Sequence, residues 1–176
     1  MRAWPRRGCL PAEPVAESGQ PAPDHARPAR LELLVVELIN RLADADSRTA
    51  DARIDAVLAR LGAACGLRRS FLLQVRLDGS WTGSHEWVAA GVPALRPQMQ
   101  AIAAQRHPLW HAAFHAGRPV AVPRKEEVPE GSGERAFLER IGARSVLMVP
   151  LMDGPRLLGI LGHDSQDAGR PWEEDE

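Results

Sequence analysis

The sequence predicts an α+β fold in which helices flank a central antiparallel sheet. Two segments before residue 66 carry apolar residues at helical spacing. Short apolar or alternating runs joined by turn residues follow, and a helical crossover separates the first pair of runs from the last pair. The chain has 176 residues. This length fits one domain plus a tail, since a single core usually occupies about 100 to 200 residues.

Composition narrows the cellular setting and the classes of partner. The 22 basic and 23 acidic residues nearly cancel, so the overall charge favours neither nucleic acid nor an anionic membrane. The two cysteines, Cys9 and Cys65, argue against a disulfide framework and indicate a reducing compartment. The sequence lacks the apolar run of a secretory signal and any stretch near about 18 apolar residues. We therefore expect a soluble, cytoplasmic protein.

The first 30 residues are rich in proline and poor in bulky apolar side chains. Such a segment buries too little surface to offset its ordering entropy, so residues 1–30 are predicted to be a disordered tail and residues 31–176 the domain. A helix opens this domain, and its apolar stripe suits pairing with a second copy in a homodimer. The stripe contains Leu31, Leu34, Val35, Leu38 and Leu42.

A second helix follows, with Thr49 as N-cap, Gly66 as the C′ residue and a stripe running from Ile54 to Cys65. Residues 71–77 and 82–89 are then predicted to form a hairpin around Asp78-Gly79. A two-residue turn places Leu73 and Val75 on the face of Thr82, Ser84 and Glu86. A one-residue bulge places them with His85 and Trp87 instead, and the sequence leaves both registers open.

Prolines and glycines mark the ends of the elements predicted in the crossover and in the last strands. Helices are predicted at residues 97–105, from Pro108 to Gly117 and at 133–141, the last closed by Gly142. Residues 119–122 are predicted to form a short edge strand because of their flanking prolines. Two apolar strands at 145–152 and 157–163 complete the pattern, joined by a hairpin loop.

Six motifs in order resemble the GAF domains of bacterial sensor histidine kinases and diguanylate cyclases. They are SHEWVAAGV at 84–92, PLW at 108–110, the acidic helix at 129–138, GARSVLMVPL at 142–151, LLGILGHD at 157–164 and RPW at 170–172.

The resemblance implies a GAF/PAS-like antiparallel sheet of about six strands, with a helical layer on one face and a ligand cavity under the crossover on the other. It also implies a C-terminal helix after Trp172, for which the sequence has no counterpart. A second departure is His163, which stands where the family more often has an apolar or aromatic residue. The cysteines of bilin-binding or sulfoxide-reducing relatives have no counterpart.

The candidate ligand residues are aromatic, basic or titratable. Trp110 and Phe114 lie four residues apart on one helix face, and with Trp87 they either wall an apolar pocket or belong to the core. Arg144 either grips an anionic ligand or makes a surface ion pair. The full set predicted to line a pocket is Trp87, Trp110, His111, Phe114, Arg144 and His163.

A metal or haem site is a weaker alternative. His111 and His115 have the helical spacing that zinc-binding helices use, but no carboxylate lies between them and His107 precedes a proline. We therefore expect no metal ligands. Glu134 and Arg135 are interpreted as a helix start.

No motif flags a catalytic residue, since no phosphate-binding glycine loop is present and Cys65 closes a helix. The sequence therefore predicts no enzyme. It predicts a sensory module that binds an unidentified small ligand and relays the signal to a kinase, cyclase or other output. A ligand-free dimerisation module is the alternative.

Overall fold

Five antiparallel strands build the centre of the molecule. The computed structural model describes residues 48–165 together with Trp172. The strands are β1 (Arg69–Val75), β2 (Trp81–Val88), β3 (Val120–Val122), β4 (Ser145–Asp153) and β5 (Arg156–Ser165), in the sheet order β2-β1-β5-β4-β3. The α+β prediction is confirmed, with five strands in the described residues where about six were expected.

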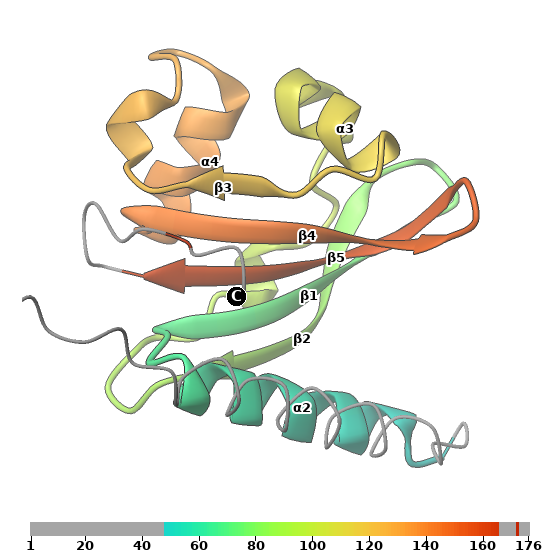
Figure 1. Cartoon of the computed structure of the whole chain (residues 1–176), viewed down its shortest axis with the longest axis vertical. Helices are drawn as coiled ribbons and strands as arrows, with labels where there is room; N and C mark the ends of the chain where they lie inside the picture. Colours follow the sequence, from blue (N-terminus) through green and yellow to red (C-terminus); the bar gives the residue numbers. More distant parts are fainter. Residues whose placement is uncertain (1–47, 166–171, 173–176) are drawn as a thin grey trace, which may run out of the picture.

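Helices cover both faces of this sheet (Figure 1). Helix α2 (Ala50–Ala64) lies on one side and packs on β1 and β2. Helices α3 (Pro108–His115) and α4 (Gly133–Ile141) lie on the other. The helix predicted from Leu31 to Leu42 lies outside the described residues, so the dimer assigned to it remains a prediction. None of the helices in the described part of the chain is both long and apolar enough to span a bilayer.

Several helix ends follow the predicted capping residues. Thr49 is the N-cap residue of α2, although its side chain makes no capping hydrogen bond, and Gly66 after the helix adopts a φ of 61°. Pro108 starts α3, where the missing N–H costs nothing because it has no intrahelical partner. Helix α4 has the predicted bounds, with Gly142 at a φ of 64°.

The hairpin between β1 and β2 contains a register shift that neither predicted alternative describes in full. Val75 pairs with Trp81 and Leu73 with Gly83, and the shift falls between Leu72 and Leu73. Beyond it Phe71 pairs with Glu86. Residues 71, 73 and 75 therefore share the α3 and α4 side of the sheet with Trp81 and Glu86, whereas Trp87 points to the α2 side.

The helix predicted at residues 97–105 is wrong. Two single 3₁₀ turns, Arg96–Gln98 and Ala104–Arg106, flank a bent stretch that pairs with the outer edge of β2 through an isolated bridge between Ile102 and Trp81. Trp81 exchanges both backbone hydrogen bonds with Ile102, at 2.8 and 2.9 Å. This pairing replaces helical bonds, and Ala101 takes a φ of 49° to allow it.

Candidate ligand-binding groove

The volume predicted to be a pocket beneath the crossover helix is filled. Trp110 and Phe114 lie on the inner face of α3 with 5% and 0% of their surface exposed. Phe114 meets Trp81 edge to face at 5.6 Å between ring centroids, and Trp110 meets Phe137 edge to face at 5.7 Å. The helical phase of these aromatics is as expected, and both belong to the hydrophobic core between α3 and the sheet.

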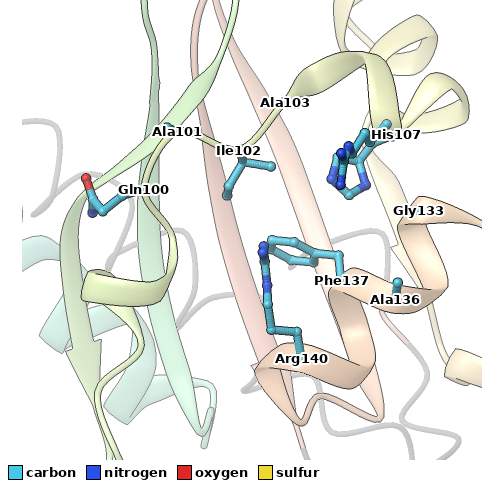
Figure 2. Close-up of a pocket in the computed structure, with 10 residues that line it drawn as sticks. Gln100, Ala101, Ile102, Ala103, His107, Gly133, Ala136, Phe137 and Arg140 are labelled. Carbon is cyan, nitrogen blue, oxygen red and sulfur yellow. The ribbon is translucent and has the colours of Figure 1, made fainter.

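A groove lies beside this core. It has a volume of about 470 Å³ and runs between the residue 100–107 segment and α4. Figure 2 shows the Phe137 and Arg140 side chains rising from α4 with Ile102 opposite them. Its walls mix apolar and basic side chains, and the lining is Gln100, Ala101, Ile102, Ala103, Arg106, His107, Gly133, Ala136, Phe137 and Arg140.

His107 joins the groove to the aromatic core. Its ring lies between Trp81 and Trp110, at centroid distances of 5.7 and 5.8 Å and interplanar angles of 21° and 15°. The residue is 6% exposed, and its buried Nδ1 atom completes no hydrogen bond, although the Gly133 backbone lies close enough to the ring to favour its protonated form. Burial lowers the pKa of His107, while the nearby Glu134 carboxylate acts to raise it. The imidazole of His107 therefore loses its proton at a lower pH than the side chain of a free histidine.

Glu134 is the acidic counterpart of this histidine. It is fully buried, and its Oε1 accepts a hydrogen bond of 2.9 Å from the backbone N–H of Leu109. A carboxylate at that position stabilises the start of α3, because the first N–H groups of a helix have no internal partner. Its Oε2 atom has no partner, so the groove wall hides two unsatisfied polar atoms, on His107 and Glu134.

Two arginines stand on opposite walls of the groove. Arg140 on α4 holds its guanidinium carbon 5.3 Å from the centroid of the Phe137 ring. Arg106 lies in the 3₁₀ turn before α3. Neither makes an ion pair within residues 48–165 and 172. By contrast Arg135, on the same helix as Arg140, pairs with Glu139 at 2.9 Å.

The six residues predicted to line one pocket do not come together. Trp87 packs against α2, where a Cβ added at Gly62 would lie 2.1 Å from its ring. His163 lies on that same face, with its Nδ1 2.8 Å from the Ser70 hydroxyl. Both are therefore separated from Trp110 by the sheet.

The remaining candidates lie on the surface. Arg144 is exposed, and its backbone N–H and carbonyl bond to Ser165 and Lys125 at the end of the sheet. His111 contacts His115 on α3, with 4.3 Å between ring centroids and an interplanar angle of 48°. Burial and the neighbouring His115 lower the pKa of His111. The described residues contain no group of three or more potential metal ligands.

The sequence reasoning missed the residues that do line the groove. His107 was set aside because it precedes Pro108, and Glu134, which lies behind the groove wall, was interpreted as a helix start. Both residues stand at the starts of helices, and a hydrogen bond from Leu109 to Glu134 joins those two helix starts. Arg106 and Arg140 carry no distinguishing pattern in the sequence.

Among the described residues, Asp164 and Glu86 are the two other buried or partly buried carboxylates near the sheet, and both have structural partners. Asp164 forms an ion pair with Arg69, with both side chains almost fully buried. Glu86 accepts hydrogen bonds from the backbone N–H groups of Leu95 and Arg96, at 2.8 Å each. Both carboxylates hold neighbouring segments in place.

Comparison with known proteins agrees with this architecture. A family model described as GAF domain matches residues 49–176. No curated protein sequence matches the chain.

Solved structures share the fold at low identity. The phycocyanobilin-bound GAF domain of a cyanobacterial phytochrome has a TM-score of 0.67 at 17% identity, over 82% of this chain and 84% of that one. The phycoerythrobilin-bound form from a cyanobacterial phytochrome has a TM-score of 0.66 at 15% identity, over 84% and 86%. The blue-light-absorbing PixJ GAF domain of Thermosynechococcus elongatus has a TM-score of 0.53 at 22% identity, over 88% and 78%.

Proposed function

This chain belongs to the GAF domain family, and from that premise we propose that it is a sensory module of bacterial signal transduction. It binds a small molecule in the groove between the residue 100–107 segment and α4. The bound state then biases the terminal helices, which pass the signal to an output domain or partner such as a kinase or cyclase. The physical requirement is only that the ligand binds one of two arrangements more tightly than the other.

One observation carries the proposal: the groove is lined by the buried imidazole of His107, whose Nδ1 atom has no hydrogen-bond partner among the described residues. Buried polar groups in native proteins are almost always hydrogen-bonded, because leaving one unpaired costs about 1 to 3 kcal/mol. Small-molecule sites combine apolar walls with a few polar groups of this kind. A ligand that enters the groove meets this imidazole at the edge of an aromatic stack.

The ligand is proposed to be held without a covalent bond to cysteine. The phytochrome GAF domains above bind bilins, but Cys65 of this chain lies at the end of α2, across the sheet from the groove. Cys9 lies outside the described residues. A reversible, non-covalent ligand fits this placement.

The proposal is tested by filling the groove. Ala136 is an exposed lining residue of α4, so Ala136→Phe occupies the groove without entering the core. Ala112→Phe makes the same change at an exposed position of α3 outside the groove. In a thermal-shift screen of small metabolites, at least one compound should raise the melting temperature of the wild type and of Ala112→Phe by several degrees. A ligand at 100 times its Kd stabilises by about 2.7 kcal/mol.

Ala136→Phe should remove that stabilisation. If every stabilising compound acts equally on Ala136→Phe, or if none stabilises the wild type, the groove is not a ligand site.

The second candidate function is a ligand-free dimerisation module, and the packed core beneath α3 favours it. It predicts that no compound stabilises the wild type while the full chain still associates through the helix from Leu31 to Leu42, which sedimentation analysis measures. Metal or haem sensing has less support, since His111 and His115 are two imidazoles without a third ligand in the described part of the chain.

A further inference from the structure

We propose that the groove selects small organic anions, with the oxyanion bound by Arg106 and Arg140 and the apolar body lying against Phe137 and Ile102. This inference rests on the proposed function and names the chemical class of its ligand. It follows from four features of the groove: the sign of its charges, the freedom of its arginines, its apolar floor and its buried histidine.

The charges that line the groove all have one sign. Its titratable lining residues are Arg106, His107 and Arg140, and no carboxylate belongs to the lining. The nearest acid, Glu134, is fully buried behind the wall and accepts a hydrogen bond from Leu109. A concave surface with one sign of charge raises the local concentration of ligands of the opposite sign.

The two guanidinium groups are available to a ligand. Arg69 pairs with Asp164 and Arg135 pairs with Glu139. Arg106 and Arg140, like the exposed Arg118 and Arg144, make no such pair within the described residues. Arg140 lies over the Phe137 ring, a contact that stabilises the position of the planar group. A guanidinium presents paired donors that match a carboxylate or phosphate.

The apolar lining of the groove favours a ligand that has an apolar part as well as a charge. Phe137 and Ile102 form the nearly buried base of the groove at 3% and 4% exposure, and Ala101, Ala103 and Ala136 contribute the more exposed apolar surface beside them. Water is displaced favourably from such surface only by an apolar group. A ligand with both a charged end and an apolar body therefore satisfies the whole lining, whereas inorganic phosphate satisfies only the arginines.

His107 adds a donor that responds to the ligand. Charged neighbours face it from both walls, since Glu134 and Arg140 belong to α4 and Arg106 to the preceding turn. An anion between the arginines offsets their repulsion of an imidazolium, so it favours the protonated ring. The flanking Trp81 and Trp110 faces also favour a cation.

The test uses two dyes that share one aromatic body, with the full chain. The anionic dye is 8-anilinonaphthalene-1-sulfonate, and its neutral counterpart is N-phenyl-1-naphthylamine. Both are titrated by fluorescence into the wild type, Arg106→Gln and Arg140→Gln. Arg118→Gln, an exposed arginine outside the groove, is the matched control. Ala136→Phe reports whether a dye lies in the groove.

The anionic dye should bind the wild type and Arg118→Gln equally and lose about tenfold in affinity in each groove variant, in line with a charge-assisted hydrogen bond. The neutral dye should change less than about twofold in all of them. Arg140→Lys, which keeps the charge but not the paired donors, should restore only part of the affinity. Benzoate and phenyl phosphate should displace the anionic dye, whereas benzamide should not, and their relative strength separates carboxylate from phosphate ligands.

Two failures are distinguishable. If Ala136→Phe blocks both dyes but the arginine variants do not discriminate between them, the groove binds ligands and anion selectivity is overturned. If Ala136→Phe affects neither dye, the groove is not a site, and the proposed function falls with the inference. Thermal unfolding of each variant verifies that a lost affinity does not reflect a lost fold.

Discussion

At the scale of single residues, the most consequential feature is a buried ion pair. Arg69 and Asp164 are 1% and 0% exposed and bridge β1 and β5. The arginine also donates to the carbonyls of Ile141 and Pro93, at 3.1 and 3.2 Å. One side chain thus ties two strands to the end of α4 and to the loop after β2. The Oδ1 atom of Asp164 has no partner.

This pair makes stability depend on pH in a definite direction. Burial raises the pKa of Asp164 from 3.8 to about 6, although Arg69 acts against the rise. Between pH 3.8 and about pH 6 the Asp164 carboxyl is therefore protonated in the folded chain but ionised in the unfolded chain. The stabilisation of the folded state by this bound proton is fully present below about pH 4 and is lost as the pH rises to about 6.

Asp164→Asn removes this titration and isolates its effect. The variant should be destabilised overall, because Arg69 loses its counter-ion. From about pH 4 to about pH 6, however, the free energy of unfolding of the wild type should fall by up to ~3 kcal/mol relative to that of the variant, because each pKa unit corresponds to about 1.4 kcal/mol. Urea unfolding of both proteins across this range measures the difference.

Asp153→Asn, at the exposed β4–β5 hairpin, controls for the loss of a surface charge. A free-energy difference between wild type and Asp164→Asn that stays constant with pH contradicts the raised pKa.

Residue placement was predictable on helices and less so on strands. The four-residue spacing of Trp110 and Phe114 put both on the buried face of α3. Trp87 and His163 were assigned to the wrong side of the sheet for a pocket beneath α3, because strand faces alternate with every residue. The shift between Leu72 and Leu73, which sets the face of Trp87, has no signature in the sequence.

At the scale of elements, local capping decided which predictions hold. Helix α4 begins after Ser132, whose hydroxyl accepts the Arg135 N–H at 3.1 Å, and it ends at a glycine in the left-handed region. Both signals are local, so the bounds are as predicted. The segment at 97–105 lacked such signals and followed a distant partner, the edge of β2. Tertiary pairing outweighed helix propensity there.

The docking of α4 against the crossover requires a glycine. A Cβ added at Gly133 would lie 1.7 Å from the carbonyl oxygen of Arg106, a backbone atom that cannot turn aside. Gly133→Ala should therefore cost about 1 to 3 kcal/mol of unfolding free energy, as overpacking does. It should also widen the groove and weaken binding of the anionic dye.

Gly117→Ala is the comparison, because Gly117 has a φ of 67° and nothing within 4 Å of the added atom. It should cost only the backbone strain, about 1 kcal/mol, and leave the dye affinity unchanged. Equal effects on dye affinity at the two glycines contradict the close contact. Urea unfolding and dye titration give both quantities.

At the scale of the whole molecule, the sheet separates two independent layers. The α2 side contains Trp87 and His163, and the α3 and α4 side contains the aromatic core and the groove. A change confined to one layer should therefore alter global stability without altering the binding surface of the other.

Gly62→Ala tests this separation. Alanine normally stabilises a helix interior over glycine by about 0.5 to 1 kcal/mol. At this position the added carbon would lie 2.1 Å from the Trp87 ring, so the variant should be less stable by about 1 to 3 kcal/mol. The dissociation constant of the anionic dye should stay within about twofold of the wild type.

Trp87→Leu removes the obstructing ring, so the added cost of Gly62→Ala should largely disappear in that background. If Gly62→Ala leaves stability unchanged but shifts dye affinity, the two layers are coupled.

The residue 99–103 segment beside β2 has a consequence for how copies of this protein meet. It pairs with the outer edge of the first half of that strand: Ile102 bonds to Trp81, Met99 to the N–H of Gly83, and the Gln100 amide to the Gly83 carbonyl at 3.0 Å. The opposite edge, β3, has three residues between two prolines. Unpaired strand edges are the usual template for amyloid-like growth. Among the described strands both edges are therefore shortened as templates, which disfavours edge-to-edge association of copies at high concentration.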